Sequence, residues 1–241
     1  MGVALTEDCQ GSIVHAVRFL HGSGPVFYAC LPRGDEARRR LASRLWDHLA
    51  ATESPCWQRC QSAAVETSPI QLERGLLGRP HLLLGEYPGP AISFSESGGR
   101  VWAALCGDGA DIGIDAAGND EFQGEYPLHR VFQPAELEHA SRLAGGEVAA
   151  AAALLWSIKE AAVKALGCAF HLVEPRQIMV TPAAEEAVEA DGGHTFAVVL
   201  SAKARQRFPL AAGQALQVRS FPQRRMWLSI AHLHRRPTAH A

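Results

Sequence analysis

One long helix, predicted from about Glu147 to Leu166, most constrains how this chain can fold. The segment is rich in alanine, which has the highest helix propensity of the common residues. Gly167 follows it, where the residue after a helix commonly adopts a left-handed conformation. We therefore expect the second half of the protein to be built around this helix.

Shorter segments on both sides of the helix predict a mixed fold. A helix is expected at 35–50 and another begins at 134, with strands at 26–31, 91–94, 101–106, 112–115, 178–181, 195–200, 216–221 and 226–231. Proline and glycine punctuate residues 55–90, which predicts loops there. Each half thus offers a helix and several strands, which predicts an α+β protein of two similar α/β subdomains, residues 1–108 and 109–241.

Composition narrows the function. The chain has 241 residues, of which 47% are hydrophobic, enough to bury a core. Lys and Arg number 23 against 25 Asp and Glu, so the chain lacks the broad positive field expected for binding nucleic acid or an anionic membrane. The sequence shows neither a secretory signal nor an apolar run approaching about 20 residues, so we expect a cytoplasmic protein.

The six cysteines are scattered, which is typical of reduced thiols in a chain too large to need disulfides. Cys56 and Cys60 resemble half of a zinc site. A second Cys/His pair at ligand spacing does not follow them, so the sequence does not favour zinc.

The long helix carries a polar face. Helical spacing places Trp156, Glu160 and Lys164 on one side, with Lys159 beside them. Taken alone, this pattern describes a surface helix with a Glu160–Lys164 pair.

Asp115 gives this face a possible chemistry. It ends an apolar strand just after Gly113, a glycine that allows close approach of a ligand or another backbone. Asp115 and Glu160 can hold Mg²⁺ through oxygen atoms, and nearby lysines can neutralise phosphate. Displacement at a pyrophosphate requires this combination.

Two motifs then resemble a known family. Gly-Ile-Asp at 113–115 and WSIKEAAVKALG at 156–167, in this order, resemble the signature of Sfp-type 4′-phosphopantetheinyl transferases. Gly78-Arg79-Pro80 is similar to a third family element, Gly-Lys-Pro. The resemblance implies a pseudo-twofold pair of subdomains in a monomeric chain, with coenzyme A and Mg²⁺ in the cleft between them.

The resemblance also implies an activity, that of a holo-[acyl-carrier-protein] synthase. The enzyme would move the phosphopantetheine arm of coenzyme A onto a serine of an apo acyl or peptidyl carrier protein. Adenosine 3′,5′-bisphosphate would be released.

Site roles carry over residue by residue. Asp115 and Glu160 would ligate Mg²⁺, and Glu160 would also accept the proton of the acceptor serine. Lys164 would bind the attacked phosphate, and Arg79 the nucleotide phosphates. Ser95 and Lys159 complete the expected coenzyme A contacts. The arginines of the first helix region, Arg33, Arg39, Arg40 and Arg44, are further candidates among which the sequence does not choose.

The sequence departs from the family pattern at two positions. Ala117 stands where many members carry a second acidic residue, and Glu96 stands where they carry a histidine after the serine equivalent to Ser95. A carboxylate does not favour contact with phosphate. Glu96 is thus interpreted either as a turn residue or as a replacement metal ligand.

The sequence leaves three alternatives open. A degenerate transferase fold could bind carrier protein or coenzyme A without turnover. Ser95 to Gly99 resembles a nucleophile elbow, which would make Ser97 the nucleophile of a hydrolase if a helix followed it. Phe122 and Tyr126, in the loop 119–127, would either contact the carrier protein or anchor the loop.

Overall fold

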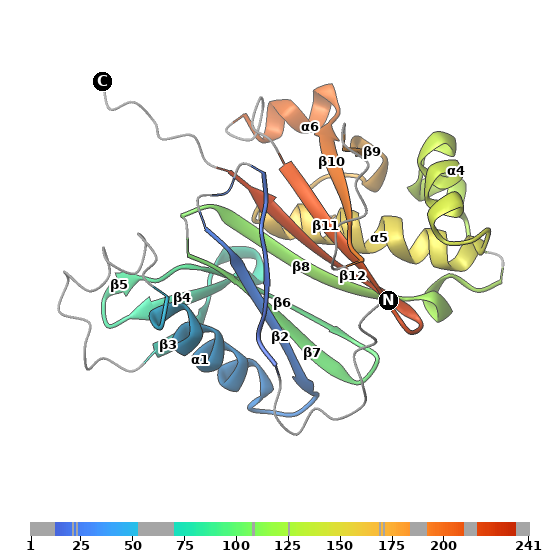
Figure 1. Ribbon diagram of the computed structural model, residues 1–241. Coiled ribbons are helices and arrows are strands. Elements are labelled where there is room, and N and C mark those ends of the chain that lie inside the picture. The colour runs from blue at the N-terminus through green and yellow to red at the C-terminus, as the bar shows by residue number, and fades with distance from the viewer. Residues whose placement is uncertain are drawn as a thin grey trace.

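The computed structural model describes residues 13–20, 22, 24–52, 70–107, 109–124, 126–168, 170, 172–183, 192–209 and 216–234. Cys56 and Cys60, the half-site considered for zinc, lie outside these ranges. Figure 1 shows two lobes, each with a sheet and a principal helix, α1 in the first and α5 in the second. None of the helices in the described part combines the length and apolar character of a membrane span.

The first lobe is built on a four-stranded antiparallel sheet in the order β1-β2-β7-β6. Its strands are β1 (His15–Val17), β2 (Val26–Pro32), β6 (Ala91–Ser97) and β7 (Arg100–Cys106). Helix α1 (Ala37–Ala50) buries Leu41, Leu45 and Leu49 against this sheet. Their four-residue spacing places the three leucines on one helix face, so the helix predicted at 35–50 is confirmed, beginning at Ala37.

A small three-stranded sheet lies where the sequence predicts loops. It consists of β3 (Ile70–Arg74), the 3₁₀ turn η1 (Leu76–Gly78), β4 (Pro80–Leu84) and β5 (Tyr87–Pro88). Its prolines stand at the first residue of β4 and on the edge strand β5, two positions that tolerate proline because no ladder donor is needed there. Leu82 and Leu84 are buried in the core beneath α1.

The second lobe contains a five-stranded antiparallel sheet in the order β8-β12-β11-β10-β9. Its strands are β8 (Asp111–Gly118), β9 (Ile178–Pro182), β10 (His194–Leu200), β11 (Leu216–Gln223) and β12 (Met226–Leu233). Helix α5 (Val148–Ala165) packs against this sheet (Figure 1). A Cβ atom at Gly113 would lie 1.9 Å from the carbonyl oxygen of Ala161, so only glycine lets α5 lie this close to β8.

Short helices complete the second lobe. They are η2 (Asn119–Phe122), α3 (Leu128–Val131), α4 (Pro134–Leu143), η3 (Pro175–Gln177) and α6 (Ala202–Arg207). Glu136, in the first turn of α4, accepts a hydrogen bond from the backbone N–H of Gln133 at 2.8 Å. This capping interaction fixes where α4 begins.

The two sheets meet along their edge strands β6 and β8. The backbone N–H of Ile114 donates to Ser93 Oγ at 3.1 Å, and that of Ala116 donates to Ser95 Oγ at 3.2 Å. Apolar side chains of both sheets, Trp102 and Ile114 among them, form a third core cluster between the lobes. The predicted mixed fold of helices and sheets is confirmed, while its pseudo-twofold symmetry stays a prediction.

Candidate active site

A cavity of about 330 Å³ lies between the lobes. Its charged lining comes from both of them: Arg38, Glu73, Arg74 and Arg79 from the first lobe, and Glu160 and Lys164 from α5 of the second. Arg79 and Glu160, which are far apart in the sequence, therefore face the same cavity.

Asp115 lies at the centre of a hydrogen-bonded chain beside this cavity. Lys164 Nζ donates to Asp115 Oδ1 at 2.7 Å and to the carbonyl oxygen of Ile114 at 3.1 Å. Ser95 Oγ donates to the same Oδ1 atom at 2.8 Å. Because Gly113 lets α5 approach β8, the helix brings Lys164 within reach of the strand. The structure thus brings together three of the predicted site residues.

Glu160 is the second carboxylate of the site. Burial raises the pKa of Glu160, and the negative charge of Asp115 raises it further, while Lys164 acts in the opposite direction. Two carboxylates that repel each other in a partly buried site are stabilised by a cation, and carboxylate oxygens suit Mg²⁺. Asp115 and Glu160 therefore fit a magnesium ion.

The chain supplies few ligands for that ion. Within the described ranges, no group of three or more His, Cys, Asp or Glu side chains is arranged to hold a metal. Ala117 shares a face of β8 with Asp115, as alternation along a strand requires, but it is buried in the core with residues of α5. The other ligands of a bound metal would have to be oxygens of a substrate or of water.

The structure corrects the position expected for Lys159. Its side chain is fully buried and donates to both carboxylate oxygens of Glu136, at 2.9 and 3.1 Å. It also donates to the carbonyl oxygens of Ile178 at 2.7 Å and Pro175 at 2.9 Å. Burial lowers the pKa of Lys159, an effect that Glu136 opposes. Lys159 therefore ties α5 to its own lobe and is not brought to the cavity as predicted.

The structure also places Glu96 with arginines of the first lobe, whereas it was considered as a metal ligand. Its carboxylate pairs with Arg38 at 2.9 Å and with Arg33 at 3.3 Å. Neighbouring residues of a strand point to opposite faces, so Ser95 reaches Asp115 while Glu96 points toward α1. The idea that Glu96 replaces a metal ligand is thus corrected.

The hydrolase alternative for Ser97 lacks its structural context. Gly98 and Gly99 have φ of +58° and +71° and form the tight turn that joins β6 to β7. A nucleophile elbow must lead into a helix, but this turn leads into a strand. Ser97 is part of an ordinary hairpin.

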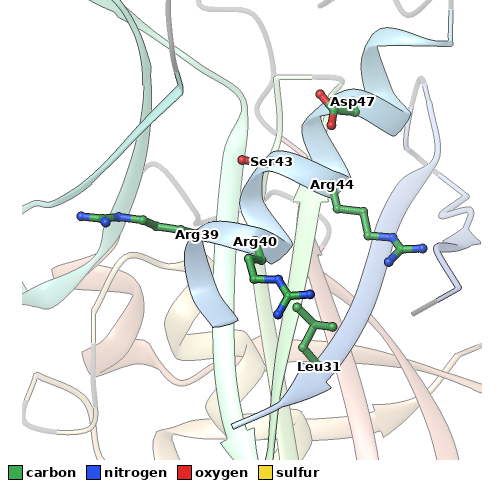
Figure 2. Close-up of a pocket in the computed structure, with 6 residues that line it drawn as sticks. All are labelled: Leu31, Arg39, Arg40, Ser43, Arg44 and Asp47. Atoms are coloured by element: carbon green, nitrogen blue, oxygen red, sulfur yellow. The ribbon is translucent and has the colours of Figure 1, made fainter. Parts of the chain in front are cut away.

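The structure separates the arginines of the first lobe. Arg39, Arg40 and Arg44 line a different hollow of about 410 Å³ on α1, together with Leu31, Ser43 and Asp47 (Figure 2). Neither Glu160 nor Lys164 borders that hollow.

Arg38 is the residue of α1 that lines the cavity, and it is not among the arginines predicted from the sequence. It lies three residues before Leu41 and seven before Leu45, so helical spacing places it beside the buried face of α1. This spacing was the sequence feature that could have identified Arg38. Its guanidinium lies over the ring of Phe94, 5.7 Å from the centroid.

The loop after β8 is held by aromatic packing. Phe122 is buried, and its ring lies 5.0 Å from that of Tyr126 and 6.2 Å from that of Trp156. These contacts support the anchoring role for Phe122, one of the two roles left open by the sequence.

Comparisons with known proteins agree with the motifs. Residues 111–212 match the family model described as "4'-phosphopantetheinyl transferase superfamily". Among solved structures, the ACPS-CoA complex of Chronobacterium ammoniagenes is 18% identical, with a TM-score of 0.42, over 53% of this chain and 98% of that one. A search of curated proteins gave no match. The matched segment includes Asp115, Glu160 and Lys164, and this part of the chain is similar to the 4′-phosphopantetheinyl transferase superfamily.

Proposed function

We propose that this protein transfers the 4′-phosphopantetheine arm of coenzyme A to a serine of an apo carrier protein in a magnesium-dependent reaction. The observation that carries the proposal is the inter-lobe cavity, where Glu160, Lys164 and Arg79 face one space and Lys164 bonds to Asp115. A site with two carboxylates and several cations fits a metal-bound pyrophosphate.

Each side chain has a role in this proposal. Asp115 and Glu160 would hold the magnesium ion, which supplies positive charge to stabilise the charge that develops on the pyrophosphate. Lys164 would bind the phosphate under attack, and Arg79 the nucleotide phosphates. Ser95 would keep the Asp115 carboxylate oriented through its 2.8 Å hydrogen bond.

The transfer exchanges the phosphoanhydride linkage of coenzyme A for a phosphoester linkage to the serine. A bond forms between the serine Oγ and the phosphorus that carries the pantetheine arm, and the bond from that phosphorus to the 5′-phosphate oxygen of the nucleotide breaks. Glu160 takes the serine proton directly or through water, and adenosine 3′,5′-bisphosphate leaves with the electron pair of the broken bond.

We further propose the two-lobed, single-chain Sfp-type arrangement, acting as a monomer in the cytoplasm, with subdomains 1–108 and 109–241. The change from one sheet to the other between β7 and β8 supports this division. Cys168 is a free thiol, which fits a reducing compartment.

Mass spectrometry of the carrier tests the proposal. Purified protein is incubated with coenzyme A, Mg²⁺ and several apo carrier proteins, alongside a sample with EDTA and a carrier whose acceptor serine is replaced by alanine. We expect a mass gain of one phosphopantetheine arm in the complete reaction alone. Binding of coenzyme A without any mass gain would favour the degenerate, non-catalytic alternative.

A further inference from the structure

An ion pair at the border of the cavity links the two lobes. Arg79 precedes β4 in the first lobe, and its Nη2 donates to Oδ1 of Asp111, the first residue of β8 in the second lobe. The side chains are 25% and 11% exposed, so the pair is largely removed from solvent. Such a pair is geometrically better defined than a surface ion pair.

Arg79 also contacts the turn that follows α5. Gly167 has φ of +75°, and a Cβ atom there would lie 2.6 Å from Arg79 Nη1. The guanidinium therefore packs directly against the turn that ends α5. The same helix carries Glu160 and Lys164, so packing fixes the position of Arg79 relative to both.

The Arg79 guanidinium has one hydrogen-bond partner, Asp111, among the residues that the structure describes. It carries five N–H groups in a rigid plane, and the bond to Asp111 uses one edge of that plane. Arg79 also lines the cavity. An arginine held along one edge can offer its other N–H groups to a phosphate without first losing side-chain entropy.

We propose that Asp111 is a positioning residue that presents Arg79 to the phosphates of coenzyme A. This inference rests on the proposed function and adds a residue to it. The two possible effects of losing Asp111 on coenzyme A affinity have opposite signs. If only charge mattered, removing a negative charge beside an anionic ligand would tighten binding. If Asp111 positions Arg79, its loss weakens binding.

Calorimetric titration with coenzyme A and with adenosine 3′,5′-bisphosphate tests the inference without a carrier protein. We expect Asp111→Ala to weaken both affinities about tenfold, because a charge-assisted contact loses its orientation. Asp111→Asn retains an acceptor oxygen and should lose less. In an Arg79→Gln background, Asp111→Ala should change neither affinity further. Glu138→Ala is the control, since it removes the partner of Arg142 on α4, away from the cavity.

The outcomes are distinct. Unchanged or tighter binding by Asp111→Ala, or an equal loss in the Arg79→Gln background, would overturn the positioning role. If Asp111→Ala does not fold, Asp111→Asn is compared in the wild-type and Arg79→Gln backgrounds, and tighter binding than wild type, or an equal loss in both backgrounds, would reject the inference. A wild-type protein that binds neither ligand would reject the proposed function as well.

Discussion

Lys159 and Glu136 form a buried ion pair that fastens α5 to α4 and to the start of β9. The two side chains are 0% and 4% exposed, and the carboxylate also accepts from the backbone N–H of Val180 at 2.7 Å. Removing one member leaves the other charged and unpaired inside the protein. We expect Lys159→Met to lower the free energy of unfolding by about 3 kcal/mol or more, measured by urea denaturation.

A double variant separates pairing from packing at this site. Lys159→Met combined with Glu136→Gln removes both charges and should lose less stability than the two single losses added together. Simple additivity would mean that the two residues do not stabilise each other. Lys203→Met, on exposed α6, serves as the control.

Loss of either carboxylate of the site should reduce transfer by orders of magnitude. Asp115→Ala and Glu160→Ala remove the oxygens proposed to hold magnesium, and these matter more to the transition state than to packing. Turnover and melting temperature should be measured on the same samples. Near-normal turnover at limiting Mg²⁺ in either variant would reject the metal assignment.

Glu160→Gln should stabilise the metal-free protein at neutral pH. Because the pKa of Glu160 is raised on folding, its charged form disfavours the folded state, and the cost appears as pH rises above the unfolded value. We expect the melting temperatures of variant and wild type to converge toward pH 4 and to separate as pH increases. A difference in melting temperature that stays constant across pH 4–8 would show that the ionisation of Glu160 is not its cause.

Lys164 should oppose metal binding while assisting transfer. Its ammonium lies 2.7 Å from Asp115 Oδ1, so Lys164→Gln removes a positive charge beside a proposed ligand. We expect tighter Mn²⁺ binding, followed by electron paramagnetic resonance without coenzyme A, together with slower transfer. Lys164→Arg should restore transfer only in part, because guanidinium and ammonium differ in shape. Weaker Mn²⁺ binding by the glutamine variant would argue that Lys164 chiefly orients Asp115.

Glu96→Ala should leave the magnesium titration of the transfer reaction unchanged. Glu96 pairs with Arg33 and Arg38 on the α1 side of β6, and Arg38 lines the cavity. Releasing Arg38 from its partner should modestly strengthen coenzyme A binding, measured by calorimetry. A several-fold rise in the Mg²⁺ concentration for half-maximal rate would restore Glu96 as a metal contact.

The sequence alone determined the elements with strong periodicity or a clear end signal. The helices at 37–50 and 148–165 and the four late strands appear close to their predicted bounds because local pattern and burial agree there. The strand expected to end at Asp115 continues to Gly118, so Asp115 lies inside β8 and not at its end. The motifs Gly-Ile-Asp and WSIKEAAVKALG likewise led to the superfamily that the comparison with family models supports. The small sheet from Ile70 to Pro88 was missed because its prolines sit at a strand start and on an edge.

Only the tertiary structure decided which charged side chains share the site. Adjacent helix residues point about 100° apart, so Lys159 turns into its own lobe while Glu160 lines the cavity. Strand alternation likewise sends Ser95 to Asp115 and Glu96 to the arginines beside α1. The link from Arg79 to Asp111 depends on how two lobes pack, a relationship between distant segments that no local pattern encodes.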